Sequence, residues 1–427
     1  MSPTTSADPL ALQRYADGAA ELDADLRRLA GRLAAAATTD PGRAAATASL
    51  AEDIAGLAST EAATSRWVGS VGVAFGLADA GSWTTAPVIE ALVDLARNPE
   101  DTAEVAETVE GLEVLGVGSS VMAAAARALG PSGLADLAHD RPDLVGPTDG
   151  MPPSARYAAN RLLISSAMTD ERDPDRRARL ERLLRDDPAT GRARQILQFD
   201  PRGDGRVAEV FGDLATATSV GVLVPGMSTD LDNFDRTVAD HAADLAHRAS
   251  QVANSKGVIG SVAVVAWLGY DPPDGWSHDL GELHDATGER RARIGGEALV
   301  ALLAGLPKVP GQFRTLIGHS YGTTTVGAAL LAGADVDSVV AMGSPGMLVD
   351  DVDELGRPHT DFYVLAARHD VIAELGWFGR SPTSPGSGFV RLEADGTGHS
   401  SYFVDGSSSQ ANVIAALLDR DDLLAPG

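Results

Sequence analysis

The tightest constraint on the fold is a pentapeptide, Gly318-His319-Ser320-Tyr321-Gly322, that separates two runs of different character. Residues 314–317 before it are apolar, as in a buried strand, and residues 323–332 after it are small helix formers. Glycines on both sides of Ser320 leave room for a sharp strand-to-helix turn that exposes the hydroxyl above the strand. The pattern predicts a nucleophilic serine, although the pentapeptide alone is also compatible with an ordinary glycine-rich turn.

Three further strand-like runs follow the pentapeptide, at residues 337–342, 362–367 and 389–393. The second run leads to Asp370 and the third leads to His399. Where a serine sits on a turn of this kind, the acid and then the histidine follow it along the chain in this order. We expect Ser320 Oγ to attack an acyl carbonyl, His399 to accept its proton, and Asp370 to fix the imidazole tautomer.

Other residues compete for the roles of acid and base. Asp361 and Asp395 are alternative acids, and both are also compatible with turn or cap positions. His359 and His369 are alternative bases, but the first precedes the strand that carries the acid and the second is its direct neighbour. We expect His319, inside the pentapeptide, to pack or to form a hydrogen bond rather than to act as a base.

The sequence upstream of the pentapeptide supplies four more strands. Asp204-Gly205 is typical of a hairpin turn between the first two. The third and fourth are almost continuously apolar, as in parallel strands with helices on both faces. These strands are predicted at 195–199, 206–211, 220–224 and 262–268, with crossover helices at 234–252 and 282–303. The pattern indicates an α/β fold around a mostly parallel sheet of eight strands.

Six short stretches also carry a family resemblance. They lie at 154–161, 224–227, 267–273, 317–322, 343–346 and 398–403, within about residues 151–419. In these stretches the chain resembles a bacterial alpha/beta-hydrolase family formerly catalogued as a domain of unknown function. The resemblance implies the alpha/beta-hydrolase fold and a serine hydrolase with a Ser-Asp-His triad, and it implies no particular substrate.

Backbone N–H groups are expected to form an oxyanion hole beside the nucleophile. One would come from Tyr321, directly after the serine, and the other from Met227, in the loop after the third strand. Loop residues near the expected catalytic groups predict a substrate pocket with an apolar acyl site. These candidates are Gly226, Tyr270, Met347, Trp377 and Tyr402. For each aromatic residue among them, a place in the buried core is an equally good reading.

The first 150 residues differ from the rest because their periodicity is helical throughout. Helices are predicted at 10–37, 43–57 and 88–106, and residues 147–153 form a boundary rich in proline and glycine. We therefore expect an α-helical domain at 1–150 and the hydrolase domain at 151–427. Trp67-Val68-Gly69 resembles the W-x-G turn of small helical-hairpin proteins exported without a cleaved signal, with an ordinary helical turn as the alternative.

Composition limits the classes of partner. A net charge of −26 argues against nonspecific binding to nucleic acid or to anionic lipid. The chain starts without the pattern of a signal peptide and has no membrane-spanning run, so we expect a cytoplasmic protein, with non-classical export through the helical domain as the alternative. An Asp/Asn-rich segment at 230–235 lacks the glycine and the closing glutamate of a calcium loop. We expect neither a metal nor an organic cofactor.

The expected function is hydrolysis of a small-molecule carboxylic ester through an acyl-enzyme, in the manner of an esterase or lipase. A peptidase or amidase and a thioesterase would use the same machinery. An alternative of another class is a catalytically idle scaffold that serves as an interaction module. The sequence does not identify a protein partner for the helical domain.

Overall fold

The computed structural model describes Arg28 and residues 119–427, except 188–189, 259 and 275–287. The chain divides into two compact units, one of residues 1–117 and 124–136 and the other of residues 118–123 and 137–427. The helices predicted before residue 118 lie outside the described residues, except for Arg28, and the Trp67-Val68-Gly69 turn also lies outside them. The N-terminal helical domain and its boundary at 147–153 therefore stay predictions.

Within residues 119–184, four helices precede the sheet: α5 (Ser119–Asp140), α6 (Pro142–Val145), α7 (Pro153–Asp170) and α8 (Pro174–Leu184). α5 is interrupted at Gly130, which has a φ of 67° and stands directly before Pro131. α8 begins where the Asp173 carboxylate accepts hydrogen bonds from two backbone N–H groups of its first turn, at 2.8 and 3.1 Å. No helix in the described part of the chain is long and apolar enough to cross a membrane.

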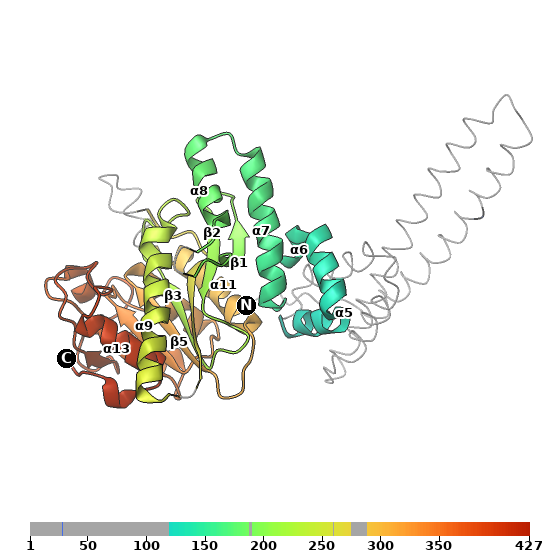
Figure 1. The fold of residues 1–427 in the computed structure, drawn as a ribbon. Helices are drawn as coiled ribbons and strands as arrows, with labels where there is room; N and C mark the ends of the chain where they lie inside the picture. Colours follow the sequence, from blue (N-terminus) through green and yellow to red (C-terminus); the bar gives the residue numbers. More distant parts are fainter. Residues whose placement is uncertain (1–27, 29–118, 188–189, 259, 275–287) are drawn as a thin grey trace, which may run out of the picture. The chain divides into compact units, whose positions relative to one another are not determined.

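A single sheet of eight strands forms the centre of the second unit (Figure 1). The strands are β1 (Gln195–Asp200), β2 (Arg206–Phe211), β3 (Ser219–Val224), β4 (Val262–Leu268), β5 (Phe313–His319), β6 (Ser338–Met342), β7 (Asp361–Leu365) and β8 (Val390–Leu392). Their spatial order is β1-β2-β4-β3-β5-β6-β7-β8. The prediction of a mostly parallel eight-stranded sheet is confirmed.

Strand direction divides the sheet into two parts. β1 and β2 form an antiparallel hairpin, and β2 also pairs antiparallel with β4. The hairpin turns at the predicted place, where Gly203 and Gly205 adopt φ values of 63° and 81°. From β4 to β8 every pairing is parallel. The carboxyl ends of β3, β5, β7 and β8 therefore meet at one edge, where open α/β sheets place their ligands.

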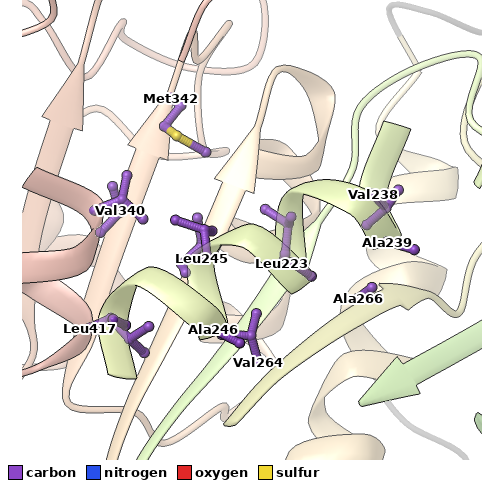
Figure 2. Close-up of a cluster of buried hydrophobic side chains, with 14 of the residues drawn as sticks. Leu223, Val238, Ala239, Leu245, Ala246, Val264, Ala266, Val340, Met342 and Leu417 are labelled. Carbon is purple, nitrogen blue, oxygen red and sulfur yellow. The ribbon is translucent and has the colours of Figure 1, made fainter. Parts of the chain in front are cut away.

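Helices cover both faces of the sheet. α9 (Asp240–Lys256) and α13 (Ser408–Leu417) pack on one face, and α11 (Arg290–Gly305) and α12 (Tyr321–Leu331) pack on the other. Residues of β4 alternate between these cores, Val264 and Ala266 facing the first and Val265 and Trp267 the second. Figure 2 shows the first core, with Leu245 of α9 and Leu417 of α13 in one cluster with Val264. Burial on both faces explains the continuous apolar runs.

The first crossover helix begins differently from the prediction. A π-helical turn, η1 (Asp235–Ala239), precedes α9 where the sequence suggests one regular helix from residue 234. Hydrophobic periodicity does not register such a turn, because one wide turn leaves the apolar positions of a long helix almost unchanged. Three short 3-10 helices complete the described elements: η2 (Val352–Leu355), η3 (Val371–Glu374) and η4 (Asp421–Leu423).

α11 and α12 approach each other at backbone distance. A Cβ on Gly296 would lie 2.7 Å from the carbonyl carbon of Ala328 and from the nitrogen of Ala329. A Cβ on Gly295 would lie 2.8 Å from Cγ2 of Thr325. The two adjacent glycines of α11 therefore set how closely the neighbouring helix can pack.

Candidate active site

Ser320 occupies the strained turn between β5 and α12 that the pentapeptide predicts. Its φ of 56° and ψ of −132° are unusual for a residue with a side chain. A Cβ on Gly318 would lie 2.9 Å from Cα of Thr323, and one on Gly322 would lie 2.3 Å from the carbonyl oxygen of Val224. Both glycines are thus required by close backbone contacts, and the turn leaves only 8% of Ser320 exposed.

Asp370 and His399 form a hydrogen-bonded pair at the same edge of the sheet. Asp370 follows β7 and caps η3, and His399 lies in the loop between β8 and α13. His399 Nδ1 lies 2.9 and 3.0 Å from the two carboxylate oxygens of Asp370. A carboxylate can only accept, so Nδ1 carries the proton and Nε2 is left as the acceptor.

A buried tyrosine holds the carboxylate from its other side. The Tyr402 hydroxyl donates to Oδ2 of Asp370 and accepts the Ala367 N–H at 3.0 Å. Burial would raise the pKa of Asp370, but the hydrogen bonds from His399 and Tyr402 outweigh it and hold that pKa below its ordinary value. The Asp370 side chain is therefore an ionised acceptor at neutral pH, fixed at both oxygens.

Gly343, directly after β6, lies beside this pair. Its φ is 58°, and a Cβ there would lie 2.7 Å from Oδ2 of Asp370 and 3.0 Å from Nδ1 of His399. A side chain at this position would separate the acid from the imidazole. The sequence marks Gly343 only as part of a family motif and does not reveal this packing requirement.

His319 supports the loop that carries the imidazole. Its Nε2–H donates to the backbone carbonyl of His399 at 2.7 Å, and the two rings are 4.9 Å apart. Burial, followed by the nearby His399, lowers the pKa of His319 to about 4. His319 is therefore a neutral hydrogen-bond donor at physiological pH, in the packing and hydrogen-bonding position that the sequence suggests.

The alternative acids and bases lie elsewhere. Asp361 is exposed at the amino end of β7, which is the opposite edge of the sheet. The Asp395 carboxylate accepts the N–H of Ser408 at 3.0 Å. His359 and His369 are both exposed, and neither lines the cavity that contains Ser320. Of the candidate acids and bases, Asp370 and His399 contact each other, and His399 lines the cavity together with Ser320.

A cavity of about 390 Å³ opens above these residues, and Ser320 and His399 both line it. Apolar residues of the lining come from three loops, with Met227 after β3, Pro345 after β6, and Trp377 and Phe378 after β7. Among the described residues no hydrogen bond joins the Ser320 hydroxyl to His399. The contact between nucleophile and base is commonly long before substrate binds.

The two residues predicted as oxyanion donors both line this cavity. Tyr321 is the first residue of α12, and Met227 belongs to the loop after β3. A Cβ on Gly226 would lie only 2.7 Å from Cβ of Ser320, so glycine allows the loop to approach the nucleophile. The Tyr270 hydroxyl donates to the carbonyl of Pro225 at 2.6 Å and holds this loop from behind.

The predicted substrate contacts separate into two groups. Gly226 and Trp377 line the cavity, and Trp377 is 39% exposed. Tyr270, Met347 and Tyr402 do not line it, and each is at most 1% exposed. Tyr270 supports the β3 loop and Tyr402 supports the acid. An aromatic residue in a pocket and one in the core have the same sequence signature, so the sequence could not separate the two.

One wall of the cavity was not foreseen from the sequence. It comes from η1 and the start of α9, and it includes Arg236, Thr237 and His241. Within the described ranges, no group of three or more His, Cys, Asp or Glu side chains is arranged to hold a metal ion. At the suspected calcium segment, Asp230 instead accepts the N–H groups of Asp232 and Asn233, at 2.8 and 2.9 Å.

Known proteins resemble this chain in sequence and in structure. An uncharacterized protein of Mycobacterium tuberculosis is 33% identical over 222 residues, which are 49% of this chain and 80% of that protein. A second uncharacterized protein of that species is 28% identical over 368 residues, 68% of this chain and 54% of its own length. Acetyl xylan esterase 1 from a Thermoanaerobacterium species superimposes with a TM-score of 0.29 at 13% identity, covering 51% of this chain and 80% of that structure.

A family model described as alpha/beta hydrolase matches residues 200–379. The match begins at the end of β1 and extends past Ser320 and Asp370 to the loop that carries Trp377. With a relative of which four fifths is covered at 33% identity, this match settles the relationship. The chain belongs to the alpha/beta hydrolase family.

Proposed function

We propose that this alpha/beta hydrolase is a serine hydrolase that cleaves carboxylic esters through an acyl-enzyme on Ser320. The observation that supports the proposal most is the Asp370–His399 pair, with 2.9 and 3.0 Å contacts, beside a cavity that also contains the strained serine. The arrangement supplies a nucleophile, a base with one free ring nitrogen, and a fixed acid.

In the proposed cycle, Ser320 Oγ attacks the acyl carbonyl as His399 Nε2 takes its proton. Asp370 keeps the tautomer and stabilises the imidazolium that forms. The N–H groups of Tyr321 and Met227 would bind the developing oxyanion, and each donor of this kind typically lowers the barrier by about 3 kcal/mol. His399 then returns the proton to the leaving alcohol, and water attacks the acyl-enzyme by the same route.

Two polar residues that contact the Asp370–His399 pair, Tyr402 and His319, would support this cycle. The hydrogen bonds from His399 and from the Tyr402 hydroxyl hold the pKa of Asp370 below its ordinary value, so the proton would stay on the imidazole and not pass to the acid. His319, neutral because burial lowers its pKa to about 4, does not compete for the serine proton. Its hydrogen bond to the backbone carbonyl of His399 would fix the position of the base relative to the nucleophile.

A fluorophosphonate probe tests the nucleophile directly. We expect one labelled residue in the folded wild type and no labelling in Ser320→Ala. Absence of labelling in folded wild type would instead support the interaction-module alternative.

The leaving group is tested with matched chromogenic substrates. We expect faster turnover of short and medium acyl p-nitrophenyl esters than of the corresponding p-nitroanilides. The opposite order would assign the protein to the peptidases or amidases, and preference for acyl thioesters would make it a thioesterase.

A further inference from the structure

The catalytic cavity has one wall of unusual electrostatic character. The lining residues that the structure describes include no Asp or Glu, although the chain has 60 acidic and 34 basic residues. Of the described residues in the lining, Arg236 is the one with a permanent charge. A cavity that excludes carboxylates and retains a guanidinium is the reverse of the surrounding composition.

Arg236 is not engaged with the protein itself. No ion pair or side-chain hydrogen bond connects it to another part of the chain that the structure describes. Two of the three carboxylates within four residues are engaged elsewhere: Asp235 pairs with Arg194 at 2.8 Å and Arg182 at 3.5 Å, and Asp232 pairs with Arg179. For the third, Asp240, no ion pair with Arg236 is found in the described part of the chain. Arg236 is exposed on the cavity wall with its five N–H donors available.

The π-helical turn accounts for this arrangement. Asp235 and Arg236 are adjacent in η1, and successive residues of a helix point in different directions. Asp235 therefore turns toward Arg194 beside β2, and Arg236 faces the cavity. π-Turns inside longer helices are frequent at functional sites.

The described side chains on the wall formed by η1 and the start of α9 carry about one positive charge at neutral pH. Burial lowers the pKa of His241, and its Nδ1–H is already used to donate to the Thr237 carbonyl at 3.1 Å. His241 also stacks on Phe403 at 4.3 Å. At neutral pH it is an uncharged ring, so Arg236 is left as the cation. One guanidinium matches one monoanionic group, and a carboxylate fits its planar fork with two parallel hydrogen bonds.

The lining of the same cavity also includes the apolar side chains of Trp377 and Phe378. We propose that Arg236 binds a carboxylate on the substrate, so that the enzyme selects esters with an apolar portion and one negative charge. This inference rests on the proposed ester hydrolysis at Ser320. The preferred ligand class is therefore a monoanionic ester and not a neutral lipid ester.

Two substrate pairs that differ in one charge test this inference. p-Nitrophenyl hexanoate is compared with the p-nitrophenyl monoester of adipic acid, in which a carboxylate replaces the terminal methyl. For the leaving-group side, 4-carboxyphenyl hexanoate is compared with its 4-methoxycarbonyl analogue. Each pair is measured with wild type, Arg236→Gln and Arg236→Lys. Arg161→Gln, at an exposed arginine of α7 outside the cavity lining, is the matched control.

We expect the wild type to prefer the anionic member of at least one pair by about 10- to 100-fold in kcat/KM, as for a hydrogen bond to a charged group. Arg236→Gln should remove this preference mainly through KM, and it should lower kcat/KM far more for the anionic member of the pair than for the neutral one. Arg236→Lys should retain part of it, and Arg161→Gln all of it. The inference would be overturned by a wild type that prefers the anionic member in neither pair. A preference that survives Arg236→Gln would overturn it as well.

Failure of the inference is separable from failure of the proposed function. Titration calorimetry of Ser320→Ala with the adipate monoester measures binding without turnover. Suppose that the wild type hydrolyses no ester, but that Ser320→Ala binds this ligand about 10-fold more tightly than Ser320→Ala/Arg236→Gln. The anion site would then be supported and the proposed ester hydrolysis would be refuted. The same titration is made with 4-carboxyphenyl hexanoate. Equal affinities of the two variants for both anionic esters would refute the anion site whatever the catalytic result.

Discussion

Replacement of Tyr402 by phenylalanine should separate the support of the acid from the rest of the site. The Tyr402 side chain is fully buried, and its hydroxyl donates to the Asp370 carboxylate and accepts the Ala367 N–H at 3.0 Å. A hydrogen bond to a charged group contributes about 1.5–3 kcal/mol, and a stranded buried N–H adds a penalty of about 1 kcal/mol or more. We expect Tyr402→Phe to lose about 3 kcal/mol of unfolding free energy in chemical denaturation.

The catalytic readout of the same variant distinguishes positioning from simple destabilisation. With one of its two side-chain donors removed, the Asp370 carboxylate can rotate away from His399 Nδ1. We expect kcat to fall by about 10-fold, which does not exceed the loss typical of a misplaced catalytic group. KM should change by less than about 2-fold. Fluorophosphonate labelling should slow by the same factor, because the reaction of Ser320 with the probe needs the same base.

The pH dependence of the effect has a definite sign. The folded pKa of Asp370 is depressed, so its contribution to stability is present above the unfolded pKa of about 3.9 and is lost as the pH falls through the folded value. In Tyr402→Phe the depression is smaller. The gap in unfolding free energy between wild type and variant should therefore be larger at pH 7 than at pH 3.

A second tyrosine provides the control. Tyr363 of β7 donates to Asp421 at 3.0 Å, but its partner is exposed and lies outside the catalytic cavity. Tyr363→Phe should leave kcat and the labelling rate unchanged. The reasoning fails if Tyr402→Phe loses less than about 0.5 kcal/mol, the range of ordinary surface changes, or if both variants reduce kcat equally.

Three further predictions concern the neighbours of the nucleophile. His399→Ala should reduce kcat by at least about 10³-fold with an unchanged circular dichroism spectrum, and a mild loss would point to another base. Gly226→Ala would place a methyl 2.7 Å from Cβ of Ser320 and 3.1 Å from the carbonyl oxygen of His319, so labelling and kcat should fall by about 10²-fold, and unimpaired labelling would contradict the close approach. His319 has a folded pKa of about 4 against about 6.5 unfolded, so wild type should lose stability as the pH falls from 6.5 to 4. Thermal melts of His319→Asn should show a smaller loss in that window, and equal slopes would refute the assignment.

Much of the central fold follows from the sequence because its periodicity is simple. The strands Arg206–Phe211 and Val262–Leu268 are observed with the predicted bounds. Continuous apolar runs and glycine-bounded turns result from local chemistry that each segment carries by itself. The strand order β2-β4-β3-β5 results from pairing between distant segments, which no local pattern encodes.

The candidate site shows the same division. The Gly318–Gly322 turn and the order Ser320, Asp370, His399 are legible in the sequence, because strand ends fix where these residues emerge. The hydrogen bond from Tyr402 to Asp370 and the turn of Arg236 into the cavity are not legible, because side-chain direction within a loop or π-turn has no period. Tyr402 was predicted as a substrate contact for this reason, but it is buried in the core and hydrogen-bonded to Asp370.

The glycine pair of α11 limits how this protein can be engineered. Glycine in the middle of a helix normally lowers stability by about 1 kcal/mol relative to alanine, and its replacement is a common route to thermostable variants. At Gly296 the added methyl would meet the main chain of α12, which cannot yield as a flexible side chain can. Gly296 meets α12 at Ala328 and Ala329, near the carboxyl end of that helix, and Ser320 and Tyr321 stand at its amino end. A displacement of α12 as a whole would therefore shift the proposed nucleophile and the proposed oxyanion donor. Residue 296, remote from the cavity, should accordingly tolerate no larger amino acid in a library selected for turnover.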